Sequence, residues 1–128
     1  MTTSRAMRIA AVMGLLAVAL GAFGAHGLKK TLELHPNGMA LWEKAVFYNF
    51  IHAVMLFILG TRKPLKPIAW FGFLLGIVLF SGSLYLYALT ETHWLVYVTP
   101  FGGVSFIVGW VCLIISPPAG ENGGPNRI

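Results

Sequence analysis

The amino-acid sequence predicts an all-α integral membrane protein, a compact bundle of four transmembrane helices. Of the 128 residues, 57% are hydrophobic and only 10% are charged, whereas charged residues make up about a quarter of a soluble domain. The apolar residues fall in four continuous runs, each close to the ~20 residues that a helix needs to cross a hydrocarbon core. Runs this long and unbroken do not fit strands, and a helix satisfies its own backbone hydrogen bonds in lipid.

Short polar connections join the expected spans. The spans cover about residues 9–28, 39–60, 68–89 and 94–115 of a single domain, 1–116, and residues 117–128 form an expected flexible tail. The first connection, LKKTLELHPNG at 28–38, predicts a short interfacial helical turn, because Leu28 and Leu32 lie four residues apart before a Pro-Asn-Gly break. The other two connections are a proline-containing cationic turn and a tight polar turn.

The first span imitates a secretory signal, because Arg5 and Arg8 precede an apolar run that ends in small residues. That run is long for the apolar core of a signal, and three further spans follow it. We therefore expect a retained first helix.

The distribution of basic residues predicts the orientation. In a bundle with an even number of spans, the N-terminus, the second connection and the C-terminal tail share one side. That side carries Arg5, Arg8, Arg62, Lys63, Lys66 and Arg127, and the opposite side carries Lys29, Lys30 and Lys44. Positively charged loops remain inside, so both termini are expected in the cytoplasm. The net charge of +5 fits an anionic membrane surface rather than nucleic acid, since the basic residues form no stripe.

Small residues recur at helical spacing on three spans and mark faces where helices approach closely in lipid. The rows are Ala10, Gly14, Ala17, Gly21 and Gly24 on the first span, Gly72, Gly76 and Ser83 on the third, and Gly102, Ser105, Gly109, Cys112 and Ser116 on the fourth. A chance row is the alternative in a chain rich in glycine and alanine. The sequence leaves open whether these rows face inward or toward a second subunit.

Two polar residues lie deep in the second span. Counted at about 1.5 Å per residue from an entry near Leu41, Asn49 lies about 12 Å deep and His52 about 16 Å deep. Ser81 and Ser83 reach a similar level, which predicts a polar layer between Asn49 and a serine. Two interpretations stay open: interhelical hydrogen bonds worth about 0.6–2 kcal/mol each, or a site for a solute, proton or ligand.

Tyr48 lies four residues before His52, so the two side chains share a helix face and are expected to stack or to form a hydrogen bond. Aromatic residues also fall near the ends of the spans, where a membrane protein carries an aromatic belt. These belt candidates are Trp42, Trp70, Trp94 and Tyr97, with Trp110 as the exception inside the fourth span.

No pattern in the sequence predicts a metal, a cofactor or catalysis. His26 lies near the outer end of its span and differs from His52 by about 13 Å in depth, so the two are not expected to share one metal. His35 and His93 lie in connections and are expected in solvent. Cys112 is the single cysteine and is expected to be a packing residue. The chain has no aspartate and no phosphate-binding loop, so we expect no enzyme.

Four motifs in series suggest a family. They are GAFGAHGL at 21–28, WEKAVFYNFIHA at 42–53, LFSGSLYLYAL at 79–89 and TPFGGVSFIVGW at 99–110. This series resembles the YgdD / transmembrane protein 256 family of small membrane proteins. The resemblance implies a four-helix protein of the bacterial inner membrane, and it implies no reaction, cofactor or substrate.

The resemblance also singles out positions that fit the packing argument. His26, Tyr48, His52, Ser81 and Tyr85 fit a polar group in the outer half of the bundle, and the glycines, with Gly103 among them, fit helix contacts. Together with Asn49 and Ser83, these polar residues form the candidate binding cluster.

Two functions are compatible with these patterns. The favoured one is a structural or accessory component that forms a homo-oligomer or joins a larger membrane complex through its small-residue faces. The alternative is a binding or conducting protein that uses the cluster around His52 for a proton, a small solute or a lipid. In both cases the lipid bilayer is the surrounding partner.

Overall fold

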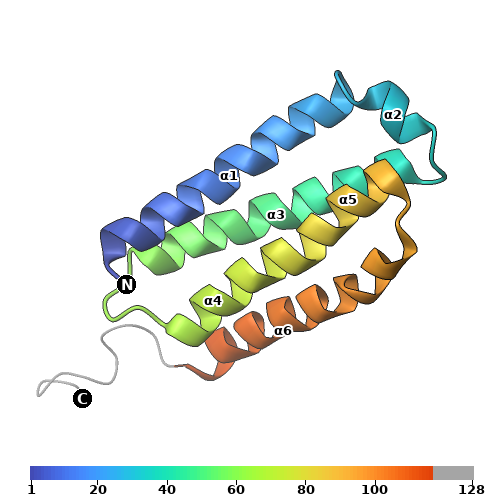
Figure 1. The fold of residues 1–128 in the computed structure, drawn as a ribbon. Helices are drawn as coiled ribbons and strands as arrows, with labels where there is room; N and C mark the ends of the chain where they lie inside the picture. Colours follow the sequence, from blue (N-terminus) through green and yellow to red (C-terminus); the bar gives the residue numbers. More distant parts are fainter. Residues whose placement is uncertain (117–128) are drawn as a thin grey trace, which may run out of the picture.

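The structure is a computed structural model in which residues 1–116 are described. These residues form four helical spans that run side by side and alternate in direction (Figure 1). All four are long and apolar enough to cross a membrane: Thr3–Ala25, Gly38–Gly60, Pro67–Thr90 and His93–Ile115. The all-α prediction is confirmed, and the expected tail at 117–128 lies outside the described residues.

The first span is helix α1, Thr3–Ala25, which begins earlier and ends earlier than the sequence predicts. It begins early because the side chain of Thr2 caps it, accepting a hydrogen bond from the backbone N–H of Arg5 at 3.2 Å. It ends at Ala25 because His26 leaves the helical conformation, with φ at −126°.

The expected helical turn in the first connection is present as α2, Lys29–Glu33. Leu32 of this turn is fully buried and packs in a cluster with Trp42 and Ala88. The chain then turns at Asn37, whose φ of 60° is a conformation that asparagine tolerates better than most residues. Helix α3, Gly38–Gly60, follows. A Cβ at Gly38 would overlap the carbonyl of Leu32, so glycine is required where α2 meets α3.

The third span consists of α4 (Pro67–Gly76), a π-helical turn η1 (Ile77–Ser81) and α5 (Gly82–Thr90). The sequence predicts one uniform α-helix for this span, whereas the structure contains a wider, π-helical turn at η1. At this level the backbone of Phe80 lies directly against Gly102 of the fourth span. That span starts with a 3-10 turn, η2 (His93–Tyr97), and continues as α6 (Thr99–Ile115).

The helices pack in the order α1, α3, third span, α6. Helix α1 lies along α3, α3 lies along α4 and α5, and α6 lies along α4 and η1, so α1 and α6 form the two outer edges (Figure 1). One end of the molecule, here called the α2 end, carries α2 and the connection between α5 and η2. The opposite end carries the N-terminus and the connection between α3 and α4 (Figure 1).

The small-residue rows lie at these helix contacts within the chain. Gly14, Gly21 and Gly24 of α1 face Ala53, Val46 and Trp42 of α3, and Gly72 and Gly76 face Gly109 and Phe106 of α6. Gly102 lies against Phe80 and Gly109 against Phe73, whereas a Cβ at Gly103 would meet only the ring of Phe80, at 3.9 Å. Within this chain, most glycines of the rows therefore lie against other helices.

The belt prediction is wrong for two tryptophans. Trp42 and Trp70 are almost completely buried, with 2% and 0% of their surfaces exposed. Each indole N–H donates to a carbonyl of a neighbouring helix: Trp42 to Leu20 at 2.7 Å and Trp70 to Leu56 at 3.2 Å. An indole N–H has to find an acceptor when it is buried, and these carbonyls supply one. They therefore join helices instead of lying among headgroups.

Candidate functional site

His52 occupies the centre of the polar interior and is 4% exposed. Both of its ring nitrogens have partners within the protein. Nδ1 lies 2.8 Å from the carbonyl oxygen of Tyr48, one turn earlier on α3, and Nε2 lies 3.0 Å from Nε1 of Trp110 on α6. A carbonyl only accepts and an indole N–H only donates, so the partners select the neutral tautomer with its proton on Nδ1. No ring nitrogen of His52 is left for a ligand.

Aromatic rings enclose the imidazole on several sides. Phe106 stacks on it with ring centroids 3.7 Å apart, and Phe73 lies at 5.2 Å. The ring of Tyr48 is stacked parallel to it at 6.1 Å, which confirms the expected contact between these two residues. Aromatic rings thus surround His52, although Tyr48 and Trp110 are themselves 37% and 39% exposed.

Asn49 and the two serines of the predicted polar layer are all buried, but Asn49 bonds to neither serine. The amide of Asn49 donates instead to the hydroxyl of Tyr85 on α5, at 2.9 Å. Ser81 donates to the carbonyl of Ala45 at 2.8 Å, and Ser83 pairs with Thr99 at 2.6 Å. Each serine thus has a partner of its own on a neighbouring element, and the longer tyrosine side chain supplies the partner of Asn49.

Within the described residues, one buried side-chain atom of this interior has no hydrogen-bond partner. Asn49 is 2% exposed, and its side-chain oxygen Oδ1 lacks a donor. A buried acceptor without a donor is uncommon in a folded protein and costs about 1–3 kcal/mol. No group in the described part of the protein donates a hydrogen bond to Oδ1 of Asn49.

Six of the seven candidate residues lie along α3, η1 and α5, but they do not form one cluster. Tyr48 stacks on His52, Asn49 bonds to Tyr85, and the two serines bond to residues outside the candidate set. His26 joins none of these contacts: it is exposed at the end of α1. Sequence reasoning misses Trp110 as the partner of His52. The position of Trp110 within the fourth span could have indicated such a contact, because an indole N–H inside a span needs an acceptor.

A groove runs along the surface between α1 and α3, toward the α2 end. Its volume is about 530 Å³. This α1–α3 groove is lined by Ala17, Val18, Gly21, Gly24 and Ala25 of α1 and by Met39, Trp42, Glu43, Val46, Phe47, Phe50 and Ile51 of α3. Glu43 is the single ionisable residue in this lining and lies near its α2 end, whereas the other end is wholly apolar.

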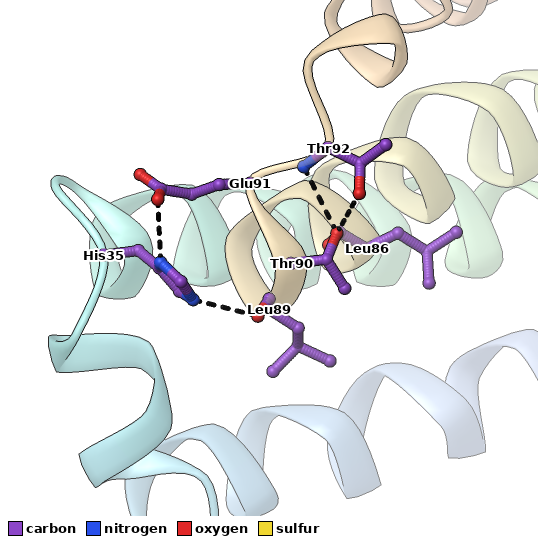
Figure 2. A network of polar contacts seen from close by, with 6 residues as sticks. All are labelled: His35, Leu86, Leu89, Thr90, Glu91 and Thr92. Carbon is purple, nitrogen blue, oxygen red and sulfur yellow. Dashed lines mark hydrogen bonds and ion pairs between the residues drawn. The ribbon is translucent and has the colours of Figure 1, made fainter.

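A second polar contact lies at the α2 end and involves His35, which the sequence places in solvent. That expectation is wrong. Nδ1 of His35 lies 3.0 Å from the carboxylate of Glu91, and Nε2 lies 3.0 Å from the carbonyl oxygen of Leu89 (Figure 2). His35 precedes α3 and Glu91 follows α5, so the contact joins two connections that are far apart in the sequence. This distance along the chain is why no local pattern predicts it.

The turn that carries Glu91 has its own hydrogen bonds. The hydroxyl of Thr90 bonds to the carbonyl of Leu86 at 2.7 Å and to the hydroxyl of Thr92 at 2.8 Å (Figure 2). Glu91 itself adopts the left-handed conformation, with φ at 52°, while its backbone N–H donates to the carbonyl of Tyr87 at 2.8 Å. The turn thus holds the carboxylate beside His35.

Comparison with known proteins gives a family. Residues 20–103 match the model described as "Protein of unknown function (DUF423)". A "UPF0382 membrane protein" of Staphylococcus epidermidis is 45% identical over 112 residues, which cover 84% of this chain and 90% of the relative. The "UPF0382 inner membrane protein YgdD" of Escherichia coli K12 is 40% identical over 119 residues, covering 88% and 89%. The Bacillus subtilis protein YwdK is 38% identical over 114 residues, covering 84% and 91%. No solved structure matches.

Proposed function

The chain belongs to the DUF423 family of membrane proteins, and we propose that it is a non-enzymatic accessory protein of the bacterial inner membrane that holds a phospholipid in the α1–α3 groove. The observation that carries this proposal is the contrast between the groove, which is open, and the interior, which is filled by its own contacts. His52, the residue with the most versatile chemistry, has both nitrogens engaged.

The lining of the groove suits a lipid chain. On α1 it extends from Ala17 to Ala25, a length of about 12 Å at 1.5 Å per residue. Apart from Glu43 near the α2 end, this lining is apolar, so an acyl chain can lie along it.

The charge of the groove favours a headgroup with an ammonium group. The exposed carboxylate of Glu43 lies at the α2 end, where the spans reach the membrane surface, and the apolar end extends toward the bilayer centre. A phospholipid has the same order of groups, with its headgroup at the surface and its chains inside. Phosphatidylethanolamine places an ammonium group where Glu43 can accept its hydrogen bonds.

The glycines of the small-residue rows lie mostly against helices of the same chain. Ala17, Gly21 and Gly24 of the first row also border the open α1–α3 groove, where we expect an acyl chain rather than a second copy. The distribution of basic residues still supports cytoplasmic termini, because Arg5, Arg8 and Arg62 lie at the end of the molecule opposite α2. In this orientation the α2 end and the headgroup end of the groove face the periplasm.

Native mass spectrometry of the protein in mild detergent tests the proposal. We expect a monomer that retains one phospholipid, and preferential rebinding of phosphatidylethanolamine over phosphatidylglycerol after delipidation. Val18→Trp fills the groove and should abolish retention. Val12→Trp is the matched control, because Val12 is also exposed on α1 but does not line the groove.

The carboxylate is tested separately. Glu43→Gln should remove the preference for phosphatidylethanolamine, while Glu33→Gln on α2 should leave it intact. A wild-type protein that retains and rebinds no lipid would contradict the proposal. So would a dimer that Val18→Trp dissociates, since the groove would then be an interface between two copies.

One observation supports the alternative of a conducting or solute-binding interior. The unpartnered Oδ1 of Asn49 is an acceptor that a water molecule or a solute donor would satisfy. This alternative requires proton or solute flux through protein reconstituted in liposomes, and flux that is lost in Asn49→Leu would favour it over the lipid proposal.

A further inference from the structure

Both ring nitrogens of His35 face hydrogen-bond acceptors. Both of its partners, the carboxylate of Glu91 and the carbonyl oxygen of Leu89, are acceptors. A neutral imidazole carries one N–H and can donate to only one of them. Only the imidazolium donates from both nitrogens. We propose that His35 and Glu91 form a proton-operated latch that fastens the connection between α2 and α3 to the end of α5.

The backbone of Glu91 supports a role for this particular side chain. Its left-handed conformation is unfavourable for most residues other than glycine and asparagine. Glycine would remove that strain at the end of α5. Glutamate is placed there instead, with a turn braced by Thr90 and Thr92 that directs its carboxylate to His35 (Figure 2). A strained residue with a defined polar contact is typical of a functional position.

The other charged groups at the α2 end do not replace Glu91. In the part of the chain that the structure describes, the titratable groups toward the α2 end of the surrounding elements are His26 on α1, Lys29, Lys30 and Glu33 on α2, Glu43 and Lys44 on α3, and Tyr85, Tyr87, His93 and the exposed Tyr97 on α5 and η2. The lysines, Glu33, Glu43, His26 and His93 are exposed. Tyr85 bonds to Asn49, and Tyr87 packs against His93. The ion pair of His35 is therefore with Glu91.

The latch closes in acid and opens as the pH rises. When His35 loses a proton, it loses either the ion pair or the bond to Leu89. Helix α2 is then held chiefly by Leu32, which packs with Trp42 and Ala88. The device is independent of what occupies the α1–α3 groove.

Hydrogen exchange of the full-length protein in lipid nanodiscs tests the latch. Protection factors for residues 29–36, corrected for the intrinsic effect of pH, are compared at pH 5.5 and pH 8. We expect protection to be about two- to fivefold higher at pH 5.5, the change corresponding to a partly exposed ion pair. The central residues of α3 serve as an internal reference and should show no such change.

Three variants separate the latch from a general effect of pH. His35→Gln and Glu91→Gly should both abolish the difference between the two pH values, and Glu91→Gly should fold normally because it relieves the left-handed strain. His93→Gln is the matched control at an exposed histidine of the same end and should behave as the wild type. An equal protection of the wild type at both pH values would overturn the proposal. A pH dependence that persists in His35→Gln would overturn it as well.

Discussion

His52 and His35 carry the same side chain in opposite hydrogen-bond surroundings. His52 lies in the interior between one donor and one acceptor, which select a neutral ring. His35 lies at the α2 end between two acceptors, which only a charged ring would satisfy together. The partners of a histidine, rather than its presence in a membrane protein, therefore indicate its role. The interior histidine joins helices, and the peripheral one is the residue on which the proposed latch depends.

The two regions also differ in how tightly they are packed, and the largest expected effect comes from the interior. A Cβ at Gly102 would overlap the backbone of Phe80, which cannot move aside as a flexible side chain does. We expect Gly102→Ala to lower the free energy of unfolding by about 3 kcal/mol, the upper end for an overpacked core. Titration with sodium dodecyl sulfate in mixed micelles, followed by tryptophan fluorescence, measures this change.

Gly82 is the matched control, because a Cβ at this position has no neighbour within 4 Å. Gly82→Ala should be neutral or stabilise the helix by up to about 1 kcal/mol. If both alanine variants have the same stability, the fourth span does not touch η1 as closely as described, and the closed interior is wrong.

The second prediction concerns the bond between His52 and Trp110. His52→Leu leaves the indole N–H without an acceptor, and we expect a loss of about 2 kcal/mol. Trp110→Phe leaves Nε2 of His52 without its donor. A double-mutant cycle in the same micelle assay should give a coupling of about 1 kcal/mol. A coupling of zero would mean that the two side chains do not contact each other.

The sequence predicts the spans well because hydropathy alone determines them. The observed third span, Pro67–Thr90, differs from the expected 68–89 by one residue at each end. The start of α1 escapes prediction, since the cap at Thr2 extends the helix through two arginines that a hydropathy pattern excludes. The π turn at η1 escapes it as well, since no local pattern in the sequence marks this turn.

The sequence predicts which residues belong to the candidate site, but it does not predict which of them form hydrogen bonds with each other. Depth along each span brings Asn49, His52 and the serines to one level, and they do lie in neighbouring helices. The depth of a residue does not tell in which direction its side chain points around the helix axis. The sequence therefore places Asn49 beside a serine, whereas its hydrogen-bond partner is Tyr85. The contact between His35 and Glu91 has no signal at all, because both residues are in connections, where the sequence predicts only solvent.

A third prediction, with a smaller expected effect, tests whether the side-chain amide of Asn49 contributes to the stability of the protein. Asn49→Leu together with Tyr85→Phe removes both partners of one hydrogen bond and also removes the unpartnered Oδ1. Replacing both members of a buried pair is nearly neutral, so stability should change by less than about 1 kcal/mol. Asn49→Leu alone should cost more, since the Tyr85 hydroxyl then lacks a partner. A loss well above 1 kcal/mol in the double variant would indicate that Asn49 binds a molecule in the interior.

The smallest expected effect distinguishes the two histidines by salt. The side chains of His35 and Glu91 are 22% and 40% exposed, so dissolved ions reach this pair, and an exposed ion pair contributes only about 0.5 kcal/mol. Raising sodium chloride from about 0.05 M to about 1 M shortens the screening length from roughly 14 Å to 3 Å. At pH 5.5 the exchange protection of α2 should therefore fall toward that of Glu91→Gly, whereas the coupling of His52 to Trp110 involves neutral groups and should not change. Equal sensitivity to salt at both places would remove the distinction between a charged and a neutral ring on which the comparison rests.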